Sequence, residues 1–247
     1  MISIKSNREI ELMRIAGKIV AELFNELERM IKPGVTTSDL DEAAYIFITK
    51  NNAKPAFLGY GGFPATICTS VNEVLIHGIP DKSELKEGDI ISIDVGAVYE
   101  GYFSDAARTY PVGKISEAKS SLLEVTEQSF MEGVKFAKAG NYLGDISAAI
   151  GDYLDSKGYF VPEEYTGHGI GRNLHEAPSI PNYGIKGSGV RLKAGMVLAI
   201  EPMVLTGSDK TEVAADKWAV IAVDKNLTAH YENTVLISDN GYEILTI

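Results

Sequence analysis

Five residues of this chain carry side chains that could bind metal ions together: Asp94, Asp105, His168, Glu201 and Glu232. They lie in short apolar or glycine-rich runs, which read IISIDVGAVY, GYFSDAART, YTGHGIGRN, VLAIEPMV and HYENTVLI. An ionised carboxylate within an apolar strand costs several kcal/mol unless it is paired or bound to a cation. Four carboxylates cannot neutralise one another, whereas two divalent cations would balance their charge. The set therefore predicts a dinuclear metal centre, provided that the fold brings the five side chains together.

The types of these residues also narrow the choice of metal. Four carboxylates and one imidazole form a hard, oxygen-rich set without a thiolate, which suits Mn²⁺, Fe²⁺, Co²⁺ or Zn²⁺. Two such ions can deprotonate a water molecule and polarise a carbonyl group. The chemistry that this set favours is therefore hydrolysis, and the identity of the metal stays open.

The two aspartates flank a predicted hairpin turn at residues 99–102, which read YEGY. If Glu100 and Gly101 are the central residues of the turn, Asp94 pairs opposite Ala107, and Asp105 lies two positions along on the same face. Both carboxylates then point the same way. Their mutual repulsion calls for a cation to offset it.

The chain repeats itself. Residues 32–43 (KPGVTTSDLDEA) match residues 138–149 (KAGNYLGDISAA), and residues 85–94 (LKEGDIISID) match residues 192–201 (LKAGMVLAIE). The second match ends with Glu201 in the place of Asp94. A looser match sets HGIP, which begins at His77, against HGIG, which begins at His168. Because the matches keep their order, we expect two related halves, roughly 1–112 and 113–247, around a pseudo-two-fold axis.

Each half reads as two helices followed by strands. Apolar residues recur at helical spacing over 7–31, at Ile10, Met13, Ile15, Ile19, Leu23, Leu27 and Met30. The segment from Thr36 to Asp39 offers N-cap residues for a helix over 38–51, and 116–137 and 145–156 are the counterparts in the second half. β-branched runs predict strands over 64–70, 90–98, 102–110, 196–204, 217–223 and 231–238.

Composition limits the partners and the compartment. The net charge of −11 disfavours non-specific binding to nucleic acid or to an anionic membrane surface. The single cysteine, Cys68, excludes an intrachain disulfide and suits a reducing compartment. The N-terminus has no apolar run of secretory length, and no segment approaches the roughly 20 apolar residues of a membrane span. We therefore expect a cytoplasmic protein without a membrane or a specific nucleic-acid partner.

A family resemblance extends over nearly the whole chain. Its motifs are ELMRIAGK (11–18), KPGVTT (32–37), NEVLIHGIPD (72–81), IDVGAVYEGYFSDAARTYPVG (93–113), GHGIGRNLHEAP (167–178), GMVLAIEPMV (195–204) and DNGYEILTI (239–247). In this combination the chain resembles a type I methionine aminopeptidase of the short bacterial kind. The resemblance implies one catalytic domain over 1–247 with the duplicated pita-bread α/β fold, in which antiparallel strands surround a central dinuclear metal site and helices lie outside.

The resemblance also implies roles for individual residues. Asp94 would bind one metal in bidentate fashion, Asp105 and Glu232 would bridge both metals, and His168 and Glu201 would complete the set. Glu201 would also shuttle the proton of the attacking water. Of two further histidines, His77 would contact the substrate near the leaving amine, and His175 would bind the scissile carbonyl and its oxyanion. The methionine pocket would comprise Phe57, Tyr60, Phe63, Cys68, Leu174, Met203 and Trp218, which are apolar, aromatic or sulfur-bearing.

The implied activity is metal-dependent removal of the N-terminal methionine from nascent proteins whose second residue is small. A hydroxide activated by two divalent metals would attack the first peptide bond. Partners would be peptides and nascent chains with an N-terminal methionine, with transient ribosome contact, and the family expectation is a monomer. The chain departs from common family residues at Phe57, Gly61, Gly96, Leu174, His230 and Asn233, which bear on the pocket and on the surroundings of the metals.

Two alternatives share the five-ligand set. Xaa-Pro aminopeptidases and prolidases carry an additional N-terminal domain, whereas the first family motif begins here at about residue 9. Type II methionine aminopeptidases carry a helical insertion between the two glutamates, for which the interval from Glu201 to Glu232 is too short. A catalytically inactive binding protein of the same fold would be expected to have lost metal ligands, and all five are present.

Overall fold

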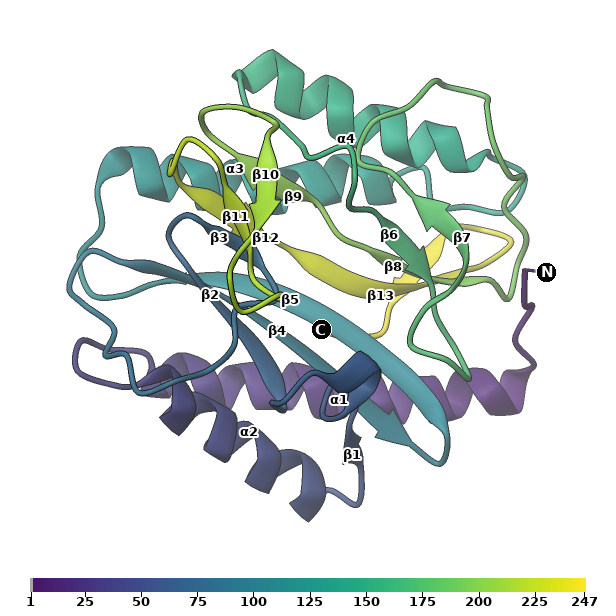
Figure 1. The fold of residues 1–247 in the computed structure, drawn as a ribbon. Helices are drawn as coiled ribbons and strands as arrows, with labels where there is room; N and C mark the ends of the chain where they lie inside the picture. The colour runs from purple at the N-terminus through teal and green to yellow at the C-terminus, as the bar shows by residue number, and fades with distance from the viewer. Residues whose placement is uncertain (1) are drawn as a thin grey trace.

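The computed structural model describes residues 2–247, which form helices around a twisted antiparallel sheet (Figure 1). The helices are α1 (Asn7–Met30), α2 (Thr37–Lys50), α3 (Glu117–Val134) and α4 (Leu143–Lys157), with a short 3₁₀ turn at Tyr60–Gly62. The strands are β1 (Lys54–Pro55), β2 (Ile67–Val71), β3 (Val74–Ile76), β4 (Ile90–Tyr99), β5 (Tyr102–Pro111), β6 (Gly167–Gly169), β7 (Glu176–Ile180), β8 (Val197–Ile200), β9 (Met203–Leu205), β10 (Thr211–Val213), β11 (Val220–Ala222), β12 (Thr228–His230), β13 (Glu232–Ile237) and β14 (Tyr242–Ile244).

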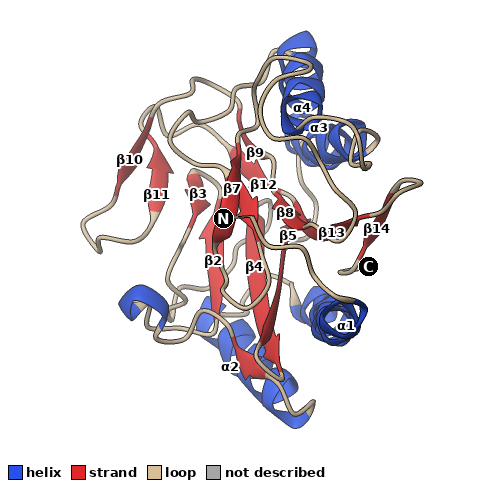
Figure 2. Cartoon of the chain, turned by 90° about the vertical axis from the view of Figure 1, so that its right-hand side faces the viewer, coloured by secondary structure: helices blue, strands red, loops and turns tan. Residues whose placement is uncertain are grey.

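The main sheet joins the two halves of the chain. Its strand order is β1-β4-β5-β13-β8-β6-β7, with β2 paired to β4 and β14 paired to β13. The helices α1 and α2 lie at one end of this arrangement, and α3 and α4 lie at the other (Figure 1). The small sheet β10-β11-β3 lies on the opposite side from α1, α3 and α4 (Figure 2). These findings confirm the predicted pita-bread architecture, while the assignment of 1–247 as a single domain of two halves stays a prediction.

Local sequence signals explain where the first two helices begin. Ser6 and Glu9 form a reciprocal capping box at the start of α1, and Thr36 and Asp39 form another at the start of α2. Of the candidate N-cap residues from Thr36 to Asp39, Thr36 is the one that caps the helix. In α1 five residues of the predicted apolar stripe are buried, Met30 is half-buried, and Ile15 is 41% exposed because it lies to the side of the stripe.

The hairpin of β4 and β5 has the predicted register. Tyr99 pairs with Tyr102, so that Glu100 and Gly101 form the turn, and both have positive φ angles, 46° and 82°. Two positive φ angles are typical of the type I′ turn, whose twist matches that of the flanking strands. Asp94 consequently pairs with Ala107, as predicted.

The predicted strand over 196–204 is wrong in one respect, because it is two strands. β8 ends before Glu201, and Pro202, which has no amide hydrogen to donate to a sheet, separates it from β9. The predicted strands over 64–70 and 217–223 are shorter than expected. Seven short strands were not predicted, since two to five residues carry too little periodicity: β1, β3, β6, β7, β10, β12 and β14.

Two large apolar clusters hold the helices against the sheet. One joins α1 and α2 to β2, β4 and β5, and the other joins α3 and α4 to β8 and β13. A third, smaller cluster contains Phe57, Phe63 and Leu174, and lies beside the site described below. No helix within residues 2–247 combines the length and the apolar character that crossing a membrane would require.

Candidate metal centre

The register of the main sheet aligns the predicted metal ligands. Ala107 of β5 pairs with Asp94 of β4 on one side and with Glu232 of β13 on the other. In the next strand, Ile200 pairs with Asn233, so Glu201 follows directly beside Glu232. The small Ala107 side chain leaves the space between the carboxylates open. Three acidic residues, Asp94, Glu232 and Glu201, thus meet in one row of the sheet, and Asp105 lies two positions along β5 from Ala107.

His168 and Asp105 complete the cluster. The Nε2 atom of His168, in β6, lies 3.9 Å from Asp105 Oδ2 and 3.6 Å from Glu201 Oε1. Its Nδ1 atom lies 2.9 Å from the carbonyl oxygen of Gly169. Because a carbonyl only accepts hydrogen bonds, Nδ1 carries the proton, and the lone pair of Nε2 faces the carboxylates. The structure therefore brings all five predicted ligands together.

The electrostatics of this cluster fit divalent cations. Asp105 and Glu232 are 4% and 1% exposed. Burial raises the pKa of Asp94 to about 6, and burial together with neighbouring carboxylates raises the pKa values of Asp105 and Glu232 well above their usual range. One oxygen of each of these three carboxylates has no hydrogen-bond partner among the described residues. Buried, unpartnered carboxylate oxygens of this kind are the ligands that divalent metal ions require.

A cavity of about 160 Å³ opens onto the cluster. Its lining contains the five candidate ligands together with His77, His175, Phe57, Tyr60, Phe63, Cys68, Leu174 and Trp218. Six of the seven predicted pocket residues therefore lie in this lining, with Phe63 and Trp218 in edge-to-face contact, their ring centroids 5.2 Å apart. The wall is apolar and aromatic, whereas the end that holds the ligands is acidic.

Met203 is the exception and corrects the predicted pocket. It does not line the cavity but lies fully buried in a separate cluster with Leu75, Ile76 and Val220. Alternate residues of one continuous strand would share a face. Because Pro202 interrupts the strand between Glu201 and Met203, these two side chains do not point to the same face.

The two further histidines differ in how they are held. His77 follows β3 with a φ angle of +60°, which is rare for a residue other than glycine. His175 packs its ring against that of His168, with centroids 4.3 Å apart, and its Nδ1 atom is hydrogen-bonded to the hydroxyl of Tyr60 at 2.8 Å. Burial lowers the pKa of His77 to about 4 and also lowers the pKa of His175. Both rings are therefore neutral near pH 7.

Several residues that fix the backbone of the ligands were not predicted. Arg108 donates to the carbonyl of Glu232 at 2.5 Å and to Asn233 Oδ1 at 2.6 Å, and Asn182 donates to the carbonyl of Glu201 at 2.9 Å. Thr234 exchanges hydrogen bonds with the backbone of Asp105 at 2.8 and 2.9 Å. Polar residues inside the apolar run ENTVLI were a signal for Thr234, but their partners depend on the tertiary fold.

Comparisons with known proteins agree with this geometry. Residues 11–239 match the model of metallopeptidase family M24. The chain is 57% identical to a methionine aminopeptidase of Clostridium acetobutylicum, covering 100% of this chain and 99% of that protein. It is 52% identical to methionine aminopeptidase 1 of Bacillus subtilis, covering 100% of this chain and 99% of the relative.

Solved structures give the same relationship. The crystal structure of a methionine aminopeptidase from Rickettsia prowazekii matches with a TM-score of 0.98 and 43% identity over 100% of both chains. A prolidase from Pyrococcus furiosus matches less well, with a TM-score of 0.80 and 27% identity over 99% of this chain and 65% of that one. The chain belongs to metallopeptidase family M24 and, within that family, to the type I methionine aminopeptidases.

Proposed function

We propose that this chain is a metal-dependent aminopeptidase that removes the N-terminal methionine from peptides and nascent proteins whose second residue is small. One observation carries the proposal: the cavity has an acidic end formed by four buried or half-buried carboxylates and His168, and an apolar wall formed by Phe57, Phe63 and Trp218. Aromatic and sulfur-bearing walls suit an unbranched thioether side chain. The acidic end suits a free amino terminus, whereas a formylated one would lack the amine.

Two divalent cations, held by Asp94, Asp105, His168, Glu201 and Glu232, would acidify a water molecule and polarise the scissile carbonyl. Glu201 lies beside Glu232 at the end of β8, with one carboxylate oxygen 3.6 Å from His168 Nε2. A carboxylate beside the attacking water can accept a proton from it and return it to the leaving amine. We assign this proton transfer to Glu201.

The histidines orient the peptide bond. Since Nδ1 of His175 is hydrogen-bonded to the Tyr60 hydroxyl, only Nε2 is left for the substrate. A neutral ring whose Nδ1 accepts from tyrosine carries its proton on Nε2 and can donate it to the carbonyl oxygen as negative charge develops there. His77, on the same cavity wall, is assigned to the amide nitrogen side of the bond. Both assignments are part of the proposal.

The relatives favour this activity over cleavage before proline. Identity to the curated methionine aminopeptidases reaches 57%, compared with 27% to the prolidase from Pyrococcus furiosus. The presence of all five ligands and both histidines in one cavity speaks against an inactive binding protein. As the family resemblance implies, we place the activity on a cytoplasmic monomer that meets nascent chains at the ribosome.

The experiment begins with the chelator-stripped protein, to which Mn²⁺, Co²⁺, Fe²⁺ or Zn²⁺ is added singly. Cleavage of Met-Ala-Ser, Met-Leu-Ser and Ala-Pro-Ser is followed by mass spectrometry, with Glu232→Gln as the inactive control. We expect metal-dependent release of methionine from the first peptide only. Cleavage of Ala-Pro-Ser would move the chain to the Xaa-Pro group, and no cleavage with any metal would support the inactive binding protein.

A further inference from the structure

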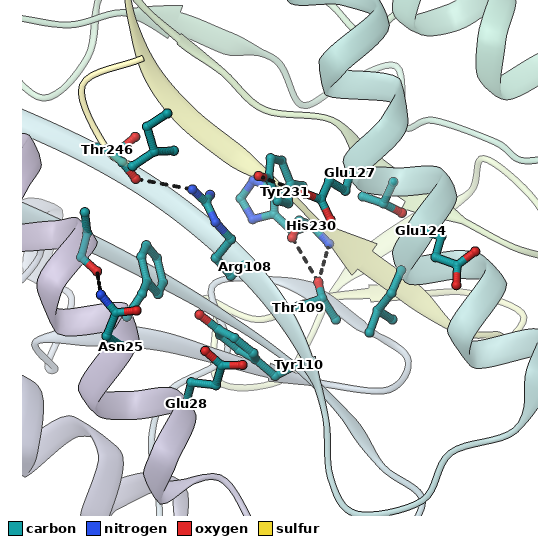
Figure 3. Close-up of a pocket in the computed structure, with 15 residues that line it drawn as sticks. Asn25, Glu28, Arg108, Thr109, Tyr110, Glu124, Glu127, His230, Tyr231 and Thr246 are labelled. Carbon is teal, nitrogen blue, oxygen red and sulfur yellow. Dashed lines mark hydrogen bonds between the residues drawn. The ribbon is translucent and has the colours of Figure 1, made fainter.

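His230 is a histidine that the five-residue set does not include. It is the last residue of β12 and is 2% exposed. The hydroxyl of Thr109 fixes its backbone through two hydrogen bonds: the N–H of His230 donates to this hydroxyl at 2.9 Å, and the hydroxyl donates to the carbonyl of His230 at 2.9 Å (Figure 3). His230 precedes the candidate ligand Glu232 by two residues, so the position of its ring relative to the metal centre can be assessed.

The ring separates the metal centre from a second cavity. This cavity, of about 470 Å³, lies between α1, β5 and α3, and His230 is part of its lining together with Arg108 and Tyr231 (Figure 3). The lining contains none of the five predicted ligands. His230 therefore occupies the boundary between the carboxylate cluster and this outer cavity, and its Nε2 atom faces the cluster.

The distances around this Nε2 atom match those of His168. It lies 3.5 Å from Glu201 Oε2 and 3.8 Å from Glu232 Oε2, whereas His168 Nε2 lies 3.6 Å from Glu201 Oε1 and 3.9 Å from Asp105 Oδ2. Two atoms that bind the same metal ion, each at about 2.1 Å, lie at most about 4.2 Å from each other. Both histidines satisfy this limit, and the two oxygens of Glu201 face different imidazoles.

A hydrogen bond does not account for the placement of this atom. His230 Nε2 is buried and has no hydrogen-bond partner within residues 2–247. A separation of 3.5 Å exceeds the usual N–H···O distance, and the atom is nearly equidistant from two carboxylates. Glu201, His230 and Glu232 can place one ligand atom each within 4.8 Å of one another, as can Asp105, His168 and Glu232.

We propose that His230 is a further metal ligand of this chain, binding through Nε2 beside Glu201 and Glu232. The inference rests on the metal centre of the proposed function but not on peptide cleavage. The set then becomes four carboxylates and two imidazoles, the donor count of the di-iron carboxylate proteins. Because imidazole suits Fe²⁺ and Zn²⁺ while oxygen ligands suit Mn²⁺, His230 shifts the centre towards the former.

The direct test counts the histidines that bind metal in the whole protein. The chain has only four, His77, His168, His175 and His230, so their ring ¹⁵N signals can be resolved and assigned. After loading with two equivalents of ¹¹³Cd²⁺, we expect one-bond ¹¹³Cd–¹⁵N coupling at two rings. His168→Gln and His230→Gln each remove one coupled ring, whereas the matched control His175→Gln removes an uncoupled one.

The outcomes separate the two proposals. Coupling at His168 alone would overturn the assignment of His230 and leave the metal centre intact, whereas coupling at no histidine would overturn both. The wild-type spectrum decides this even if a variant fails to fold.

Metal affinity provides a second measurement that does not depend on activity. In a calorimetric titration with Co²⁺, His230→Gln should weaken one of two binding events by at least about tenfold, since even outer-shell substitutions cost 10–100-fold. Glutamine is preferred to alanine because its side chain fills the space of the His230 ring and keeps the outer cavity separate from the metal centre. Unchanged affinities together with an unchanged Co²⁺ absorption spectrum would overturn the proposal.

Discussion

Gly96 lies in β4 directly opposite Asp105, where the structure leaves no room for a side chain. A Cβ atom at this position would be 2.7 Å from Ala56 Cβ, 2.7 Å from Phe57 Cε1 and 3.1 Å from Phe57 Cζ. The ring of Phe57 therefore occupies the space that a larger residue at position 96 would need.

The expected cost of Gly96→Ala follows from this crowding. Overpacking a core typically costs about 1–3 kcal/mol, and replacing glycine by alanine in extended backbone recovers about 0.4–1 kcal/mol of chain entropy. We therefore expect the free energy of unfolding to fall by about 1–2 kcal/mol. Displacement of Phe57 should also raise the KM for Met-Ala-Ser, because that ring lines the 160 Å³ cavity.

The assay is urea unfolding of Gly96→Ala, Phe57→Ala and the double variant, in chelator, so that metal binding does not enter. Phe57 supplies two of the three close contacts, while the Cβ of Ala56 remains. The double variant should therefore be about 1 kcal/mol more stable than additivity of the single variants predicts. Additivity within about 0.5 kcal/mol, or a Gly96→Ala protein as stable as the wild type, would refute the reasoning.

Three further predictions concern the site and its support. Tyr60→Phe removes the hydrogen bond to His175, worth about 0.5–1.5 kcal/mol, and should lower kcat about three- to tenfold. Tyr183→Phe, a control on the surface, should leave kcat unchanged. Equal rates for both variants would contradict the assignment of the His175 proton to Nε2. Hydrogen bonds from the Tyr102 hydroxyl and from Ser6 lower the pKa of Glu9 to about 2, so the stability that Glu9 contributes is present above the unfolded pKa of about 4.3 and is lost as the pH falls towards 2. The stability difference between wild type and Glu9→Gln should shrink over that window, and a constant difference would argue against these bonds. Chelation should lower the Tm by about 5–10 °C relative to protein with metal at 100 times its Kd, because buried carboxylates lose their counter-charge, and an unchanged melting curve would argue against the centre.

Much of the candidate site was predictable because its signals are local. An aspartate in the apolar run IISIDV needs a partner wherever that run is buried, and the YEGY turn sets the register of the hairpin through two positive φ angles. Helix starts were predictable for the same reason, since a capping box involves residues three apart, such as Thr36 and Asp39. The family motifs added the roles of individual residues, which no local pattern supplies.

Other features depend on contacts between distant segments. Met203 has a side chain suited to the pocket, yet the strand break at Pro202 directs this side chain into a separate apolar cluster. No local pattern marks Arg108, whose guanidinium group lies 4.3 Å from the ring centroid of Tyr231 and donates to the backbone carbonyl of Glu232.

The sequence by itself predicted that four carboxylates and a histidine would share cations, because burying such charges without partners is costly at any place in a fold. It also predicted two related halves and located capping and turn residues of the chain. Only the tertiary structure decided which nitrogen and oxygen atoms face one another. Those distances, including that from His230 Nε2 to Glu201, are set by the register between strands that lie far apart in the chain.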